Sequence, residues 1–68
     1  MIKEEDLQRL FEYLHPFEAN DNKYHIEFEY DEDTYTELLG IGFYKEGGYC
    51  WNMTVQEILF NYIIARGI

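Results

Sequence analysis

The 68 residues of this chain allow one domain with a single small core, which excludes a deep active-site cleft. Fourteen Asp and Glu oppose five Lys and Arg, and the resulting net charge of −9 disfavours direct binding to DNA, RNA or anionic lipid. The composition is 47% hydrophobic and 19% aromatic, more than a disordered acidic tail carries, so we expect a folded α+β domain.

Cysteine usage and the terminal sequence point to a compartment. The single cysteine, Cys50, excludes an internal disulfide framework. The first residues are acidic rather than basic, which argues against a signal peptide. Apolar stretches fall far short of the roughly 20 residues that span a bilayer. We therefore expect a cytoplasmic protein of a bacterium or an infected host cell, with no membrane partner.

The first predicted element is a helix from about Lys3 to His15. Its first turn holds three acids, which the helix dipole favours there: Glu4, Glu5 and Asp6. Apolar residues at i, i+3, i+4 and i+7 form one stripe: Leu7, Leu10, Phe11 and Leu14. Pro16 ends the helix, and turn-forming residues predict a loop over Phe17–Asn22.

Strict alternation from Tyr24 to Tyr30 predicts a half-buried antiparallel strand. Its inner face consists of Tyr24, Ile26, Phe28 and Tyr30. Its outer face consists of His25, Glu27 and Glu29, with Asp31 next in the same acidic row. A turn is expected over Asp31–Thr34, since Asp and Thr favour turns.

Two further strands are expected. The second runs from about Thr36 to Tyr44 and would direct inward Leu39, Ile41 and Phe43, and outward Leu38, Gly40, Gly42 and Tyr44. Adjacent glycines in Lys45–Gly48 predict a hairpin, because they supply positive φ angles. The third strand, Tyr49–Met53, would add to the core Tyr49, Trp51 and Met53.

A last helix is expected over about Val55–Arg66. Thr54 and Glu57 form a capping box at its start, and Gly67 suits the left-handed position after its end. This helix is apolar on nearly all sides, which is typical of a helix buried on more than one side. In so small a domain the sheet covers only one side, so we expect a subunit contact, such as a homodimer interface, through Phe60, Ile64 or Ile68.

The predicted architecture is therefore α-β-β-β-α, a three-stranded antiparallel meander with both helices packed on one face. No repeat, low-complexity run or linker divides residues 1–68, so the chain is expected to form one acidic domain.

The candidate functional feature is the acidic segment Glu18–Glu37, which contains a single basic residue, Lys23. Alternate side chains of a strand lie about 6.6 to 6.8 Å apart on one face, so Glu27, Glu29 and Asp31 would form a regular row of negative charge. Such a row resembles a line of backbone phosphates to the Lys and Arg of a nucleic-acid-binding protein. The candidate partner-binding residues are Glu27, Glu29, Asp31, Glu32, Asp33 and Glu37.

A purely structural role stays open for this surface. The acids can serve only as a solvated face that prevents the sheet from pairing with its neighbours. Gly40 and Gly42 would either leave the outer face bare for a partner or simply relieve crowding and mark a bulge.

Catalytic, cofactor and metal sites are not expected. The chain contains no Ser and no Gly-rich phosphate loop, and a nucleophilic Cys50 would need an electropositive setting that an acidic protein does not supply. His15, His25 and Cys50 lack zinc-ligand spacing. An EF-hand beginning at Asp31 would need Gly and Glu where Thr36 and Gly42 stand.

In bulk composition the chain is similar to small acidic inhibitors, many of them phage-encoded DNA mimics, that block nucleases, restriction enzymes or CRISPR effectors. This similarity is compositional and implies a non-enzymatic protein that docks on the basic, nucleic-acid-binding surface of a protein partner. The alternative is a homo-oligomeric structural or assembly module that uses its last helix as the interface.

Overall fold

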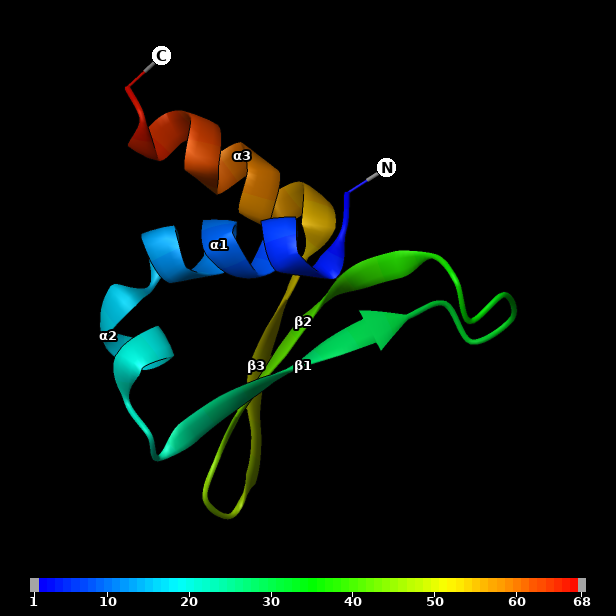
Figure 1. Ribbon diagram of the computed structural model, residues 1–68, viewed down its shortest axis with the longest axis horizontal. Coiled ribbons are helices and arrows are strands. Elements are labelled where there is room, and N and C mark those ends of the chain that lie inside the picture. The colour runs from blue at the N-terminus through cyan, green and yellow to red at the C-terminus, as the bar shows by residue number, and fades with distance from the viewer. Residues whose placement is uncertain (1, 68) are drawn as a thin grey trace.

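The computed structural model describes residues 2–67, and it shows the predicted α+β architecture with one additional short helix (Figure 1). The elements are α1 (Glu4–Leu14), α2 (Pro16–Asn20), β1 (Tyr24–Tyr30), β2 (Leu38–Lys45), β3 (Gly48–Thr54) and α3 (Val55–Ala65). Among these residues no helix is long and apolar enough to cross a membrane.

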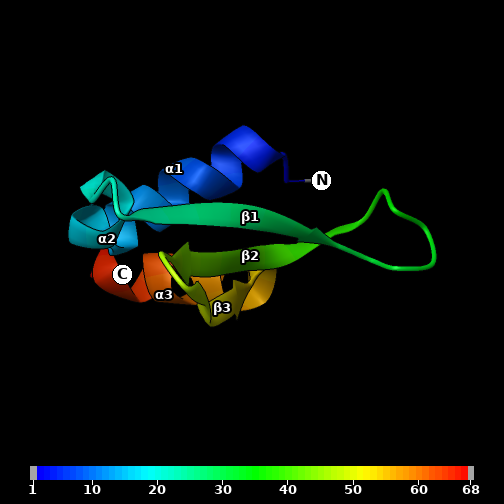
Figure 2. The same cartoon turned by 90° about the horizontal axis from the view of Figure 1, so that it is seen from below.

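The strands form an antiparallel meander in the order β1-β2-β3, and α1 packs against α3. The molecule has two layers, a sheet and a pair of helices on one of its faces, and measures only 17 Å along its shortest axis (Figures 1 and 2). The ring of Phe11 from α1 lies 6.0 Å from the ring of Phe43 on the central strand. The fully packed core consists of Leu7, Phe11, Ile41, Phe43, Met53 and Ile58.

The helix α1 ends at Leu14, directly before the residue that precedes proline, as the sequence predicts. The expected loop over Phe17–Asn22 is wrong in part, because the short helix α2 begins at Pro16. Proline at the first helical position has its φ angle already set for a helix and needs no amide donor there. Pro16 therefore both stops α1 and starts α2.

The connection between β1 and β2 is longer than the predicted turn, and β2 begins at Leu38 rather than Thr36. Asp31 Oδ1 accepts hydrogen bonds from the backbone N–H groups of Asp33 and Thr34, at 2.8 and 3.1 Å. Tyr35 has a positive φ of 56°, which turns the chain back toward the sheet. The backbone N–H of Asp31 then donates to the carbonyl of Glu37 and closes the loop.

Two bulges reverse the predicted orientation of single side chains. The register shift between Glu29 and Tyr30 inserts an extra residue in β2, so Leu39 is exposed and Leu38 packs against the core. A second shift after Phe43 places Tyr49 on the surface, while Cys50 packs against the core. The inward assignments of Leu39 and Tyr49 are therefore wrong.

The helix α3 follows β3 without a loop, and its predicted capping box is present. Thr54 Oγ1 accepts from the backbone N–H of Glu57 at 3.1 Å, and the Glu57 carboxylate accepts from the N–H of Thr54 at 3.3 Å. Gly67 has the expected positive φ of 76°. In α3 only Ile58 is fully buried, so the expected burial on several sides is absent within the single chain.

Candidate functional site

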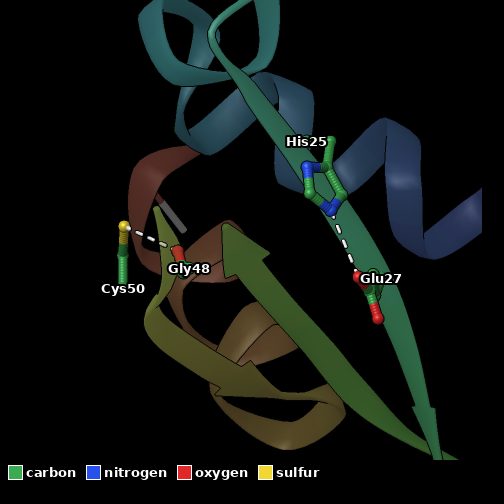
Figure 3. Close-up of polar contacts among 4 residues, drawn as sticks. All are labelled: His25, Glu27, Gly48 and Cys50. Carbon is green, nitrogen blue, oxygen red and sulfur yellow. Dashed lines mark hydrogen bonds and ion pairs between the residues drawn. The ribbon is translucent and has the colours of Figure 1, made fainter. Parts of the chain in front are cut away.

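The outer face of β1 carries two of the predicted acids. Glu27 Oε2 lies 3.1 Å from His25 Nε2, and Figure 3 shows these side chains next to each other along the strand. Glu29 Oε1 accepts a hydrogen bond from Asn52 Nδ2 of β3 at 3.3 Å. These partners fix both carboxylates on the sheet without a Lys or Arg countercharge.

Asp31 does not continue this row, contrary to the prediction. It lies after the end of β1, and its carboxylate binds the backbone N–H groups of its own loop. Short polar side chains favour such local hydrogen bonds at turns, which explains why the alternation stops there. The ordered acidic row on the strand is therefore limited to Glu27 and Glu29.

The two glycines of β2 do not leave the outer face bare. A Cβ on Gly40 would lie 2.2 Å from the carbonyl oxygen of Met53, so this glycine permits close approach of β3 at the bulge. A Cβ on Gly42 would meet the ring of Tyr44 at 2.9 Å and the carboxylate of Glu29 at 3.1 Å. The glycines therefore mark a bulge and relieve crowding. The alternative, that they leave the outer face bare for a partner, is wrong.

Tyr44 is the centre of an aromatic row that covers the remainder of this face. Its ring stacks on His25 at 5.3 Å and meets the edge of Tyr49 at 5.6 Å. Burial, followed by the negative charges of Glu27 and Glu29, raises the pKa of the Tyr44 phenol. The outer face is therefore a mixed aromatic and acidic surface rather than a bare charged one.

The other predicted acids lie in the loop between β1 and β2. This loop projects beyond the end of the sheet and opens out there (Figure 2). Glu32, Asp33 and Glu37 are exposed, and within residues 2–67 their carboxylates accept no hydrogen bond. These groups are fully available to a partner. Tyr35, which the sequence pattern does not single out, is exposed among them.

The fold brings a second acidic segment to the same end of the molecule. The phenol of Tyr30, at the end of β1, donates a hydrogen bond to Glu4 Oε2 in the first turn of α1. Both views place the start of α1 beside the base of the projecting loop (Figures 1 and 2). We name this surface the acidic end, and it consists of Glu4, Glu5, Asp6, Asp31, Glu32, Asp33 and Glu37.

The link between these two segments gives a prediction for alkaline pH. The hydrogen bond to Glu4, with partial burial and the carboxylate charge, raises the pKa of Tyr30 above its ordinary value of 10.0. Because the neutral phenol is favoured in the folded protein, this stabilisation is present below pH 10.0 and is lost as the pH rises through the higher folded-state pKa. In Glu4→Gln, NMR titration of the tyrosine ring carbons should show the Tyr30 pKa falling toward its ordinary value.

The neighbouring acid provides the control for this titration. Glu5→Gln removes the same charge from the same helical turn but leaves the hydrogen bond to Tyr30 intact. A Tyr30 pKa that falls equally in both variants would show that the nearby charge, and not the contact with Glu4, raises it.

Basic residues do not neutralise the acidic end. The ion pairs within the described part of the chain join histidine to glutamate, at His15–Glu18 and His25–Glu27. Lys23 and Lys45 lie at the opposite end of the sheet, where β1 starts and β2 finishes. Lys3 and Arg9 flank the acids in the first turn of α1, and neither forms an ion pair within residues 2–67.

No group of three or more His, Cys, Asp or Glu within residues 2–67 is placed to hold a metal ion. The Cys50 thiol lies 3.9 Å from the Gly48 carbonyl oxygen, separated from His25 and Glu27 on the sheet (Figure 3).

Comparison with protein families, curated proteins and solved structures gives no match to this chain. The assignment of a function therefore depends on the geometry and charge described above.

Proposed function

We propose that the protein is a non-enzymatic, DNA-mimic type of inhibitor that docks its acidic end on a basic, nucleic-acid-binding surface of a protein partner. The observation that supports this most directly is the gathering of carboxylates from two distant segments at one end, without Lys or Arg ion pairs among residues 2–67. Partners of this chemistry include nucleases, restriction enzymes and CRISPR effectors, which hold DNA or RNA in positively charged channels.

The shape of the acidic end suits such a partner. The projecting loop carries Glu32, Asp33 and Glu37, and it extends beyond the sheet and helices, so its acids can reach into a partner's channel ahead of the rest of the molecule (Figure 2). Asp31 fixes the loop backbone before binding, which lowers the entropy lost on docking. Exposed Tyr35 adds an aromatic side chain of the kind that anchors protein interfaces.

Electrostatic docking of this kind has a characteristic dependence on salt. Partner association should be fast at low ionic strength and should weaken steeply as salt screens the carboxylates.

The proposal is tested by displacement from DNA. Proteins of a bacterial lysate are bound to a double-stranded-DNA resin at low salt, and the pure chain is then added. We expect it to release a small set of basic proteins, identified by mass spectrometry, and to lose this effect at high salt. Polyglutamate at equal total charge is the control for bulk polyanion effects. The absence of any release, or release of the same set by polyglutamate, would contradict the proposal.

A further inference from the structure

The outer side of α3 forms an apolar patch that the single chain leaves uncovered. Its residues follow one another at helical spacings of one, three and four, so their side chains are contiguous. We name the four residues the α3 patch, and they are exposed to the following extents: Leu59 39%, Phe60 59%, Ile63 51% and Ile64 58%. The patch includes the predicted contact residues Phe60 and Ile64, whereas Ile68 lies outside the described residues.

An open groove of ≈ 520 Å³ continues the α3 patch toward the sheet. It lies between α3, the end of α1 and β3, and its lining includes Leu14, Trp51, Met53 and Ile64. Ile64 therefore belongs both to the α3 patch and to the groove. A second helix laid along α3 would cover the two together.

We propose that the α3 patch pairs two copies of this chain as a homodimer, an inference that goes beyond the proposed function and does not depend on it. Taking about 200 Å² for a fully exposed large apolar side chain, the α3 patch offers roughly 400 Å² of apolar surface. This is about half of the roughly 800 Å² per partner of a stable interface, so the groove and the polar residues that flank α3 would supply the remainder.

Charge favours a second copy over other occupants. The α3 patch contains no ionisable side chain, and a two-fold interface brings identical surfaces together, so an uncharged apolar surface is complementary to itself. The C-terminal half of α3 also points away from the projecting loop in both views (Figures 1 and 2). Pairing through α3 thus keeps the acidic ends of the two copies apart.

The small core gives an independent reason. Among residues 2–67 only six apolar side chains are buried, and α3 contributes one of them, Ile58. Chains of this size commonly need additional support, and oligomerisation is one source of it. Burial of the four patch residues against a second copy would extend the core across both chains.

The test is sedimentation velocity over a concentration series. We expect the wild-type chain to sediment as a dimer at high concentration, and Phe60→Glu to raise the dissociation constant at least about thirtyfold. Phe17→Glu is the matched control, because it makes the same change at a side chain that is 86% exposed on α2, and it should dimerise like the wild type. Dimerisation should strengthen with salt, since salt screens the repulsion between two chains of charge −9.

Several outcomes would overturn the proposal. The first is a wild-type chain that sediments as a monomer at every concentration, whether or not it binds a different protein. The second is a Phe60→Glu variant that dimerises as tightly as the wild type. Circular dichroism checks that Phe60→Glu is folded. If it is not folded, Ile63→Gln and Ile64→Gln replace it in the sedimentation test, since each keeps the helix while making the patch polar. Dimerisation as tight as that of the wild type in both variants would then contradict the proposal.

Discussion

Replacing Gly40 by Ala is expected to destabilise the protein by about 3 kcal/mol or more, which is most of the stability that a core of this size supplies. The added Cβ would lie 2.2 Å from the Met53 carbonyl oxygen and 2.9 Å from the Thr54 Cα. Both atoms belong to the backbone of β3, which cannot withdraw without breaking its pairing with β2 at the point where α3 begins. Urea denaturation followed by circular dichroism measures the effect.

Gly42→Ala is the matched control on the same strand. Its added Cβ meets the ring of Tyr44 and the carboxylate of Glu29, two side-chain ends that can move. Because alanine also restricts the unfolded chain, we expect a change in unfolding free energy of less than about 1 kcal/mol. Equal losses in the two variants would mean that the close approach of β3 to Gly40 is not what makes glycine necessary there.

The sequence is sufficient to predict the order and type of the main elements. The strand Tyr24–Tyr30, the capping box at Thr54 and the hairpin glycines before Tyr49 follow from local signals, and each is present in the structure. Local chemistry determines these features, so no knowledge of distant contacts is needed to predict them. The alternation itself fails at the strand's end, where Tyr30, predicted to face inward, is exposed.

The exact positions of the bulges could not be predicted, because one extra residue changes the face of the side chains beyond it without a regular mark in the alternation. Strict alternation of inward and outward side chains along each strand would place Leu39 and Tyr49 in the core. The two register shifts direct them to solvent instead. Gly40 is the available signal, since glycine within a strand often marks a bulge or a close backbone approach.

The candidate site is predicted in part. The exposure of Glu27, Glu32 and Asp33 agrees with the sequence pattern, but the pattern does not reveal that the acids of α1 join them. Acids in a first helical turn already have a local explanation in the helix dipole, so nothing in the sequence links Glu4 to the end of β1. The hydrogen bond between Tyr30 and Glu4, visible only in the folded structure, joins the two segments into one surface.

Neutralising the loop tip is expected to have the largest effect on partner binding. In Glu32→Gln/Asp33→Asn, association with a protein released from DNA should slow about tenfold at low salt, because two charges that steer the encounter are lost. Dissociation should also become faster, because Lys and Arg of the partner's channel lose their carboxylate partners. The fold should be unaffected, since neither carboxylate accepts a hydrogen bond within residues 2–67, and Asp31 remains to fix the loop. Stopped-flow kinetics measures both rates.

The control pair separates a defined docking surface from net charge. Glu12→Gln/Glu46→Gln also removes two negative charges, but Glu12 lies on α1 beyond its first turn and Glu46 in the turn between β2 and β3. If the acidic end enters the partner's channel, this pair should change the association rate by less than about twofold, and only the loop-tip pair should make the rate less sensitive to salt. Equal slowing by both pairs would mean that the partner responds to overall charge, and the acidic end would then have no special role in docking.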